Sequence, residues 1–463
     1  MVGVSSRHEI GDVPLTAVTR RDAWVFRGPR LGYRPGVDRQ TAPDDFAHLR
    51  IDGTRLVRRL DALGEVGAIE GPGGERGCAR LALTDEDRDG RDLVVTWMRD
   101  LGLIVEIDQI GNVFATRPGT DPTLASVMTG SHIDTVRTGG RFDGNLGVLA
   151  GLEVIETLIS HGIDTARGLT VAFFTDEEGA RFAPDMLGSL VYVGGMPIEA
   201  ALAVAAVDDH ARLGDELLRI GYAGTRPAPA VSFPSCFVEL HIEQGPILED
   251  LGVTIGVVEG VQGISWTELA IGGQSAHAGT TPMRLRRDPL LAASQITAGV
   301  RAIATEIGGD QVATVGRMDI HPNLVNVVPA SVTMTVDLRN THEQVLLDAE
   351  RRFAAIVEEV AADEGVTIER RTLARFEPVE FDAAMVDLVE ATARRLGHTT
   401  YRMPSGAGHD AQMLARVCPT AMVFTPSVNG LSHNIAEFTE HSDLEAGANV
   451  LLHVLLDRAN STD

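Results

Sequence analysis

The sequence predicts an α/β fold in which a smaller unit interrupts a larger one, and three observations support this prediction. Apolar strand-like runs alternate with helix-like runs early in the chain, as in "LASVMTGSH", "GVLAGLEVIETLISHG" and "LTVAFFTDEEG". A segment with its own order of strands and helices follows, and the first pattern then resumes with "AAMVDLVEATARRLG" and "PTAMVFTPS". Apolar strands that alternate with helices indicate a sheet with substantial parallel content.

The elements before the interruption begin with two amphipathic helices, "DGTRLVRRLDALGEVGA" and "TDEDRDGRDLVVTWMRDLG". Thr84 is the predicted N-cap of the second helix, with Asp87 at its third position. The stretches "IVEIDQIGNVFATRPG" and "FVELHIEQG" are strand-like and add to the same sheet.

The interrupting segment has the order strand, helix, strand, strand, helix, strand, from "ISWTELAIGG" to "VTIERRTLARF". This βαββαβ order is typical of the ferredoxin-like unit, which buries a core of its own. We therefore predict a first part of the larger domain at 46–260, an insertion at 261–376 and a second part at 377–463. Residues 1–45 are rich in Arg, Gly and Pro without periodicity, and we expect a surface-packed or partly disordered extension.

Composition excludes several classes of protein. The chain has no apolar run of about 18 residues and no signal-peptide core at its start, so we expect a cytoplasmic protein. The formal net charge of −25 argues against a nucleic-acid or anionic-membrane partner. The three widely spaced cysteines form no CxxC pair and predict no disulfide framework. The chain also contains no lysine, which excludes a P-loop and a Schiff-base enzyme.

Potential metal ligands follow four of the apolar runs. Each has an ordinary explanation on its own: a core histidine, an aspartate that forms a turn, or a solvated acidic edge. Together they suggest a site for two divalent metal ions with nitrogen and oxygen ligands, because side chains at the carboxyl ends of strands gather at one edge of an α/β sheet. The candidates at these places are His132 and Asp134 with Asp143 further along, Asp176 with Glu177 and Glu178, His241 with Glu243, and Ser432 with His433.

Two acidic residues near these ligands suggest supporting roles. Asp134 lies two residues after His132 and is predicted to accept the second imidazole N–H. Glu177 and Glu178 are adjacent carboxylates, and a natural division of roles is that one binds metal while the other acts as a base.

Seven motifs in order over roughly residues 50 to 460 give the chain a clear resemblance: "TGSHIDTVRTGGRFDGNLGVLAGLEVI", "FTDEEGARF", "ELHIEQGPILE", "SAHAGTTPMRLRRD", "NVVPASVTMTVDLRN", "PSGAGHDAQ" and "LSHNIAEF". The chain resembles the M20 family of metallopeptidases, in its hydantoinase/carbamoylase amidase branch. This branch includes N-carbamoyl-L-amino acid hydrolases, allantoate amidohydrolases and β-ureidopropionases. The resemblance implies a mixed-sheet, zinc-peptidase-like catalytic domain and a ferredoxin-like insertion that serves as lid and dimerisation domain.

The resemblance also implies a role for each candidate residue. His132, Asp143 and His241 would hold one metal ion, and Asp143 would bridge to the second. Glu178 and His433 would complete the second site. Glu177 would be the general base.

Further residues are implied to bind substrate. His277 would come from the partner subunit of a homodimer and stabilise the oxyanion. Asn326 and Arg339 would hold the substrate carboxylate, a role that suits the fork of an arginine. The side chain of Gln244 and the backbone of Gly406 and Ala407 would contact the ureido or carboxyl end.

These residues lead us to expect a metal-dependent amidohydrolase that converts N-carbamoyl-L-amino acids to amino acid, ammonia and carbon dioxide. Trp266 stands where allantoate enzymes carry a basic residue, which favours a less polar substrate. Allantoate amidohydrolase and β-ureidopropionase are the alternatives within the branch, and a peptidase, an N-acyl deacylase or an inactive metal-binding homologue are the alternatives outside it. Zinc, manganese, cobalt and nickel all accept such ligands.

Overall fold

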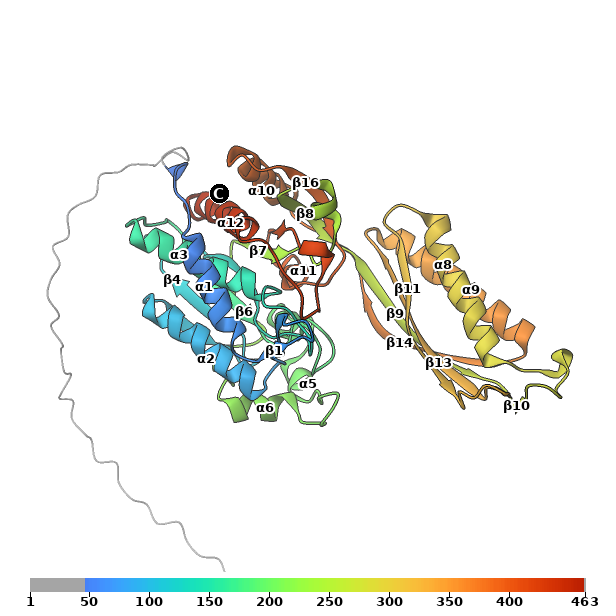
Figure 1. Ribbon diagram of the computed structural model, residues 1–463. Helices are drawn as coiled ribbons and strands as arrows, with labels where there is room; N and C mark the ends of the chain where they lie inside the picture. Colours follow the sequence, from blue (N-terminus) through green and yellow to red (C-terminus); the bar gives the residue numbers. More distant parts are fainter. Residues whose placement is uncertain (1–45, 462–463) are drawn as a thin grey trace, which may run out of the picture. The chain divides into compact units, whose positions relative to one another are not determined.

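Residues 46–461 are described by the computed structural model, and those from Leu49 onward belong to one unit that contains two large sheets (Figure 1). The extension predicted at 1–45 lies outside the described residues. The fold is mixed α/β, as predicted, and the predicted domain boundaries stay a prediction.

The larger sheet has nine strands, in the order β15-β8-β17-β7-β5-β6-β4-β3, and β16 pairs with β8. The central strands β17, β7, β5 and β6 run parallel, whereas the β3, β4 and β15 pairings are antiparallel. The sheet is therefore mixed, with the parallel part in its middle. Its strands are β3 (Ile104–Ile107), β4 (Val113–Arg117), β5 (Val127–His132), β6 (Leu169–Phe174), β7 (Cys236–Ile242), β8 (Ile255–Val261), β15 (Val379–Glu380), β16 (Thr400–Ser405) and β17 (Thr420–Thr425).

Helices cover the middle of this sheet. Every residue of β5, β6, β7 and β17 is buried, which explains the continuous apolar runs of these strands. The helices α3 and α12 pack on one another and on the central strands, and α4 and α11 contact these strands as well. The helices of this part are α1 (Gly53–Gly64), α2 (Asp85–Asp100), α3 (Asn145–Ser160), α4 (Leu187–Tyr192), α5 (Ile198–Leu202), α6 (Leu213–Ile220), α7 (Ile247–Leu251), α10 (Ala383–Arg395), α11 (Asp410–Leu414) and α12 (His441–Asn460).

The predicted start of α2 is confirmed. The Thr84 hydroxyl accepts a hydrogen bond from the Asp87 backbone N–H at 3.3 Å, and the Asp87 carboxylate accepts one from the Leu83 N–H at 2.8 Å. The first bond satisfies a donor that an α-helix leaves free at its N-terminus, and the second holds the residue before the N-cap.

The strand-like stretch "IVEIDQIGNVFATRPG" is divided into β3 and β4, which pair as an antiparallel hairpin. The division follows from Asp108, whose carboxylate accepts hydrogen bonds from the backbone N–H groups of Ile110 and Asn112. Gly111 has a φ of 87°, a conformation that favours glycine. Local side-chain bonding of this kind makes a turn where hydrophobicity alone shows a continuous run.

The inserted segment forms the second sheet, which is antiparallel and ordered β11-β13-β9-β14. The side chains of Val332, Met334, Val336 and Leu338 alternate along β13 and pack with α8 and α9 in a separate core. A two-residue ribbon, β10 with β12, lies outside this sheet. The elements are β9 (Gly263–Gly272), β10 (Ala276–His277), α8 (Pro289–Ile307), β11 (Val312–His321), β12 (Val327–Val328), β13 (Ser331–Asn340), α9 (Glu343–Glu364) and β14 (Thr367–Phe376).

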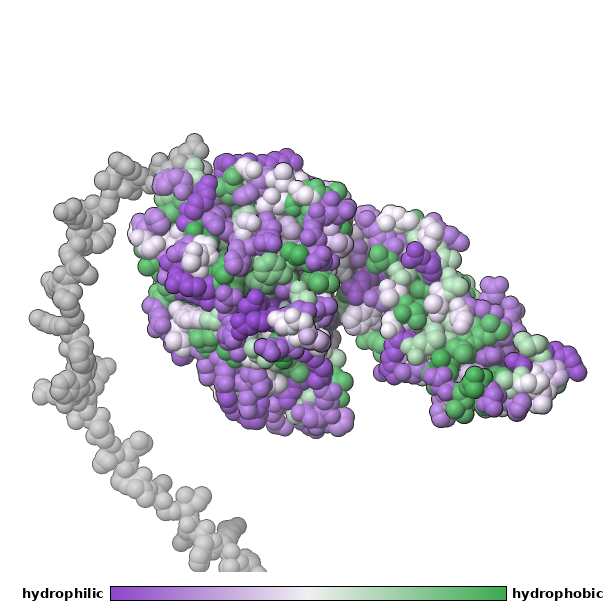
Figure 2. Space-filling model, in the orientation of Figure 1, coloured by the Kyte–Doolittle hydropathy of each residue, from purple (hydrophilic) through white to green (hydrophobic). Residues whose placement is uncertain are grey.

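The surface is largely polar on the face drawn in Figure 2, with green hydrophobic residues gathered more on the inserted segment. Near the ribbon, Met283 is 70% exposed and Leu324 is 60% exposed. None of the described helices is long and apolar enough to span a membrane. Cys78, Cys236 and Cys418 are buried and unbridged, as the sequence predicts.

Candidate metal centre

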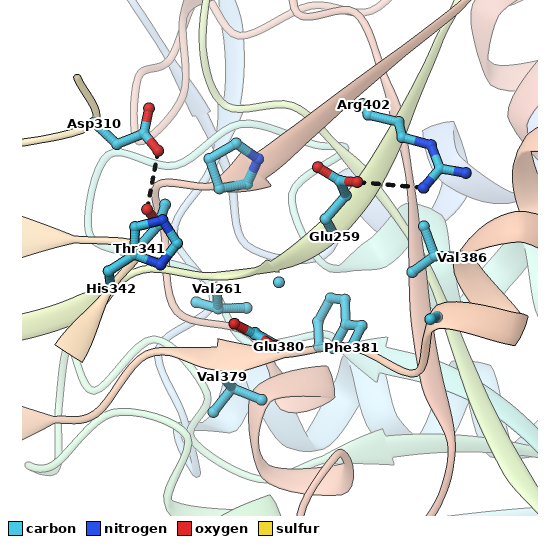
Figure 3. Close-up of a pocket in the computed structure, with 13 residues that line it drawn as sticks. Glu259, Val261, Asp310, Thr341, His342, Val379, Glu380, Phe381, Val386 and Arg402 are labelled. Atoms are coloured by element: carbon cyan, nitrogen blue, oxygen red, sulfur yellow. Dashed lines mark hydrogen bonds and ion pairs between the residues drawn. The ribbon is translucent and has the colours of Figure 1, made fainter. Parts of the chain in front are cut away.

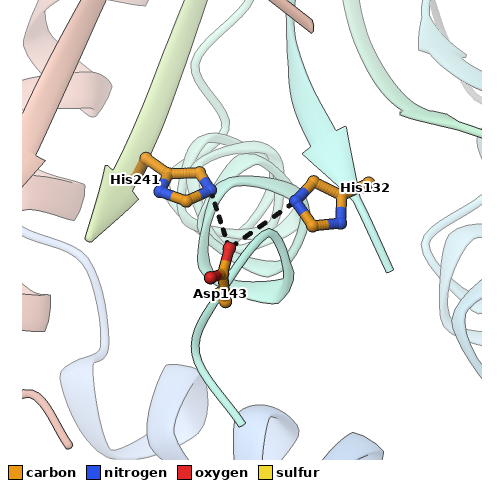
Figure 4. A group of neighbouring side chains, drawn as sticks. All are labelled: His132, Asp143 and His241. Carbon is orange, nitrogen blue, oxygen red and sulfur yellow. Dashed lines mark ion pairs between the residues drawn. The ribbon is translucent and has the colours of Figure 1, made fainter. Parts of the chain in front are cut away.

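The edge of the larger sheet brings three predicted ligands together. His132 ends β5, His241 lies near the end of β7, and Asp143 lies in the turn before α3 (Figure 4). All three are buried, and one potential ligand atom from each lies within 4.8 Å of the others. Asp143 Oδ1 is 3.2 Å from His241 Nε2 and 3.7 Å from His132 Nε2.

Backbone carbonyls orient the two imidazoles. His132 Nδ1 lies 2.9 Å from the Asp134 carbonyl oxygen, and His241 Nδ1 lies 2.8 Å from the Ile242 carbonyl oxygen. Because a carbonyl only accepts hydrogen bonds, each Nδ1 must carry the proton, and Nε2 of each ring is turned to Asp143.

The prediction that the Asp134 carboxylate accepts the His132 N–H is therefore wrong, because the backbone carbonyl of Asp134 accepts it instead. The nearest Asp134 carboxylate oxygen is 3.9 Å from His132 Nδ1, beyond a hydrogen bond, and the carbonyl takes the predicted place. The carboxylate instead accepts hydrogen bonds from the backbone N–H groups of Glu177 and Glu178, both at 3.3 Å. It thus fixes the loop after β6 in place beside β5.

Asp143 also belongs to a second group of potential ligands, with Glu178 and His433. His433 Nε2 lies 3.1 Å from a Glu178 carboxylate oxygen and 3.7 Å from Asp143 Oδ2. The two carboxylate oxygens of Asp143 therefore face different residues. Oδ1 faces His132 and His241, and Oδ2 faces His433. This is the arrangement expected of a carboxylate that bridges two ions.

Two observations indicate that the site fits a divalent cation. Asp143 Oδ1 is buried and accepts no hydrogen bond from an amide or hydroxyl group; the polar atoms that face it are Nε2 of His241 and Nε2 of His132. The donors around it are imidazole nitrogens and carboxylate oxygens, a set that suits zinc, manganese, cobalt or nickel.

Charge at the site is balanced by protons on the histidines. Burial lowers the pKa of His241, but the adjacent Asp143 carboxylate outweighs burial and raises it to about 9. The hydrogen bond with Glu178 raises the pKa of His433 to about 9 against its partial burial. Burial alone would raise the pKa of Asp143, yet these histidines hold it well below its usual range. A cation would take the place of these protons.

Glu177 lies beside the first group without belonging to it. One carboxylate oxygen is 3.4 Å from His132 Nε2, and the side chain is nearly buried. Burial raises the pKa of Glu177 well above its usual range, and the charges of Asp410 and Glu178 add to this effect. A carboxyl group with a raised pKa is suited to accept a proton and pass it on.

The structure shows contacts for four of the predicted substrate-binding residues, Gln244, Arg339, Gly406 and Ala407. The Gln244 side chain donates a hydrogen bond to Asp143 Oδ2 at 2.8 Å, which places it at the ligand cluster. Arg339 Nη1 donates to the Gly406 carbonyl at 2.6 Å, and its guanidinium also pairs with Asp337. The Ala407 N–H donates to the Ser405 hydroxyl at 3.1 Å.

His277 and Asn326 are brought together on the β10–β12 ribbon and belong to neither ligand group. The Ala278 N–H donates to the Asn326 carbonyl at 3.0 Å. His277 Nδ1 accepts hydrogen bonds from the N–H groups of Gly279 and Thr280, so the proton of a neutral ring lies on Nε2.

Two buried acids beside the ligands were not predicted. Glu437 accepts hydrogen bonds from the Phe142 and Asp143 N–H groups, both at 3.1 Å, and thereby holds the Asp143 turn. Glu239 accepts from the Ser131 hydroxyl at 2.6 Å and lies two residues before His241. A signal for Glu239 was present, because it is an acidic residue within the apolar run "FVEL".

A separate pocket of about 370 Å³ lies where the insertion joins the larger part of the chain (Figure 3). Glu259, Phe381 and Arg402 line one side, and Asp310 and His342 of the insertion line another. None of the candidate ligands lines this pocket, so it is distinct from the metal centre.

Comparison with known proteins identifies the family of the chain. Residues 128–457 match the model of peptidase family M20/M25/M40. The chain belongs to this family. Among M20-related sequences, it is 42% identical to an N-carbamoyl-L-amino-acid amidohydrolase of Rhizobium meliloti over 89% of this chain and 97% of that protein. It is 39% identical to an N-carbamoyl-L-amino acid amidohydrolase of Geobacillus stearothermophilus, over 88% and 98%. It is 33% identical to an allantoate amidohydrolase of Bacillus subtilis, over 83% and 93%.

Solved structures place this M20 chain near the predicted branch. A hydantoinase/carbamoylase family amidase from Burkholderia multivorans is 46% identical, with a TM-score of 0.84 over 89% of this chain and 99% of that one. The aminopeptidase PepT from Bacillus cereus, at 17% identity and a TM-score of 0.62, shares the fold. The predicted resemblance to the M20 family and its amidase branch is confirmed.

Proposed function

We propose that this M20 protein is a metal-dependent amidohydrolase that cleaves the carbamoyl C–N bond of N-carbamoyl-L-amino acids. One observation carries the proposal. The side chains of His132, Asp143 and His241 converge, and Glu177 lies beside them without belonging to this group of potential ligands. The relatives at 42% and 39% identity named for this activity support the choice of substrate.

The proposal includes two divalent ions per subunit, either zinc or manganese, with cobalt and nickel also compatible. His132, Asp143 and His241 would hold one ion, and Asp143, Glu178 and His433 the other. When bound, such ions act as Lewis acids that polarise the ureido carbonyl. The burial of Asp143 Oδ1 facing the Nε2 atoms of His132 and His241 supports this assignment.

Glu177 would take a proton from the attacking water and deliver it to the leaving nitrogen. Its raised pKa supports this role, because the protonated form must persist long enough to act as an acid. Arg339 and Asn326 would bind the substrate carboxylate, and Gln244, Gly406 and Ala407 would contact the remaining polar atoms.

We further propose that residues 261–376 form a ferredoxin-like lid and dimerisation domain, so that His277 stabilises the oxyanion in the partner's site. The exposed hydrophobic residues Met283, Leu324 and Val325 support this role, since Met283 follows β10, which carries His277, and Leu324 and Val325 precede its partner strand β12. Exposed apolar side chains that gather in one place are typical of interaction surfaces.

Trp266 favours carbamoyl amino acids over allantoate. It lies in β9 opposite Asp337, and the Arg339 guanidinium lies 5.8 Å from the centre of its ring. A bulky aromatic side chain beside the proposed carboxylate-binding arginine favours a less polar substrate tail over a second ureido group. Allantoate amidohydrolase remains the second candidate, because a relative at 33% identity carries that name.

The test is a substrate panel run on protein that has been stripped of metal and reconstituted with Zn²⁺ or Mn²⁺. We expect ammonia release from N-carbamoyl-L-amino acids, with weaker release from allantoate and β-ureidopropionate. Ammonia release from allantoate alone would overturn the substrate assignment. Release of free amine from N-acetyl amino acids or dipeptides, without ammonia from any ureido acid, would overturn the reaction class.

A further inference from the structure

Arg80 is a fully buried arginine whose role is not explained by the proposed ligands or base. It follows the short strand β2 (Arg76–Cys78), which pairs with β1 (Ala68–Glu70). Within the part of the chain that the structure describes, its guanidinium forms no ion pair with a carboxylate. Buried charges are usually paired, so a guanidinium bound by neutral groups alone calls for a reason.

The neutral groups that bind the guanidinium are the Cys78 sulfur, 3.3 Å from Nη1, and groups of three other segments. Nε donates to the Ile133 carbonyl, Nη2 donates to the Asn145 side-chain oxygen, and Nη1 donates to the Leu63 and Val66 carbonyls, all at 2.8 Å. Leu63 and Val66 close the end of α1. The planar fork of arginine fixes the directions of these bonds relative to one another.

Two of these segments carry the ligands of the first metal group. Ile133 follows His132 directly, and Asn145 lies two residues after Asp143. The Asn145 amide is held in turn, because its Nδ2 donates to the Arg141 carbonyl at 3.2 Å. A single rigid side chain therefore joins the backbone beside one ligand to the turn that carries another.

The backbone of Arg80 adds to this link. Its N–H donates to the Thr135 hydroxyl at 2.8 Å, and its carbonyl accepts from the Thr135 N–H at 2.9 Å. The segment from Ile133 to Thr135 is thus held at three points by one residue. This segment also supplies the Asp134 carbonyl that orients the His132 ring.

We propose that Arg80 is a positioning residue for the metal centre, which sets the separation and orientation of His132 and Asp143 by holding both of their segments on one guanidinium plane. This inference rests on the proposed function, since it assumes that these residues bind metal. Groups that hold metal ligands from outside typically change metal affinity when they are altered.

The experiment titrates Co²⁺ alone into metal-stripped full-length protein and records its visible absorption. Arg80→Lys keeps the charge and most of the length but offers one nitrogen in place of a planar fork. We expect Co²⁺ to bind about 10–100-fold more weakly, the loss typical of altered outer ligand contacts. We also expect a shifted absorption spectrum, because the ligand geometry around the cobalt changes.

Arg91→Lys is the matched control. Arg91 is as buried as Arg80, but it pairs with Asp87 and donates to the Gly111 carbonyl and, at 3.3 Å, to the Thr175 hydroxyl, none of which lies on the segments that carry His132 and Asp143. We expect this variant to lower the melting temperature while leaving the cobalt affinity and spectrum unchanged. All titrations are made well below the melting temperature of each variant, so that lost stability alone does not weaken binding.

Asn145→Leu provides a second variant, which removes the Asn145 contact of the guanidinium together with the Asn145 bond to the Arg141 carbonyl, and leaves Arg80 itself intact. We expect a smaller loss of cobalt affinity with a shift of the spectrum in the same direction. If Arg80→Lys does not fold, the Asn145→Leu result decides alone, and wild-type affinity with a wild-type spectrum would overturn the inference.

The outcomes separate this inference from the proposed function. Failure of the wild-type protein to bind Co²⁺ would refute the metal centre and the inference with it. Normal binding by the wild type, with equal affinity and spectrum in Arg80→Lys, would refute the role of Arg80 only. An equal spectral change in Arg91→Lys would also refute it, because the effect would then belong to any buried arginine.

Discussion

Glu177 is the residue whose replacement best separates catalysis from metal binding. It touches the first ligand group without belonging to it, so Glu177→Gln should keep the metal and lose the proton transfer. We expect kcat on an N-carbamoyl-L-amino acid to fall by about 10²–10⁴-fold. The measurement is steady-state kinetics together with the metal content of the purified variant. A large loss of metal would show that Glu177 is a ligand.

The raised pKa values of two histidines predict how metal affinity depends on pH. The pKa of His241 and that of His433 are each about 9 in the absence of metal, so a cation must displace their protons at neutral pH. Affinity for Zn²⁺ should therefore rise with pH and level off above about 9. The measurement is competition with a chelator of known affinity across this range, and a flat profile would contradict the prediction.

The same raised pKa values predict that the metal-free protein loses stability as the pH rises, whereas metal affinity increases. The folded-state pKa of each imidazole lies above its unfolded value near 6.5, so the stability it contributes is complete below that pH. This contribution is lost as the pH rises through about 9. Stabilisation by added metal should therefore be greatest on the alkaline side.

At the scale of single elements, the start of α2 offers a test of helix capping. Thr84→Ala removes the bond to the Asp87 N–H and should lower the free energy of unfolding by about 0.5–2 kcal/mol. Thr96→Ala is the control, because Thr96 is exposed in the same helix and donates only to the carbonyl of Asp92. Urea unfolding measures both variants, and equal losses would argue against a capping role for Thr84.

The elements that the sequence predicts well are those with long, regular patterns. The helices α2, α3, α8 and α9 and the strands β6, β9 and β13 appear where their periodicity places them. The elements that escape prediction are short or depend on distant partners. The ribbon of Ala276–His277 with Val327–Val328 is only two residues long on each side, and no periodicity can reveal it.

The candidate site shows the same division. Its ligands could be predicted because imidazoles and carboxylates after apolar strands are visible in the sequence. The role of the Asp134 carbonyl could not be predicted, because the sequence does not show which backbone atoms form hydrogen bonds. The Asp134 carboxylate was predicted in its place. Arg80 and Glu437 also escaped, because their contacts depend on segments that only folding brings beside them.

At the scale of the whole molecule, the proposed exchange of His277 between subunits can be tested by mixing two inactive variants. Glu177→Gln lacks the base and His277→Ala lacks the oxyanion group. If His277 acts in the partner's site, a mixed dimer contains one site with both residues intact. We therefore expect unfolding and refolding the two variants together to restore ammonia release that neither has alone.

The control for this experiment is each variant taken through the same refolding by itself. Light scattering reports whether the refolded protein is a dimer. No recovery in a confirmed mixed dimer would place His277 in the site of its own chain and contradict the proposed arrangement.

Because all three thiols are buried, a thiol-reactive label can be directed to a single introduced cysteine. Cys78, Cys236 and Cys418 lie in the interior, and burial raises the pKa of each, that of Cys418 to about 12, so maleimides should ignore the native chain. A single cysteine introduced at the fully exposed Val325 would then be the one labelled position. A fluorophore there could follow ribbon motion in real time during turnover.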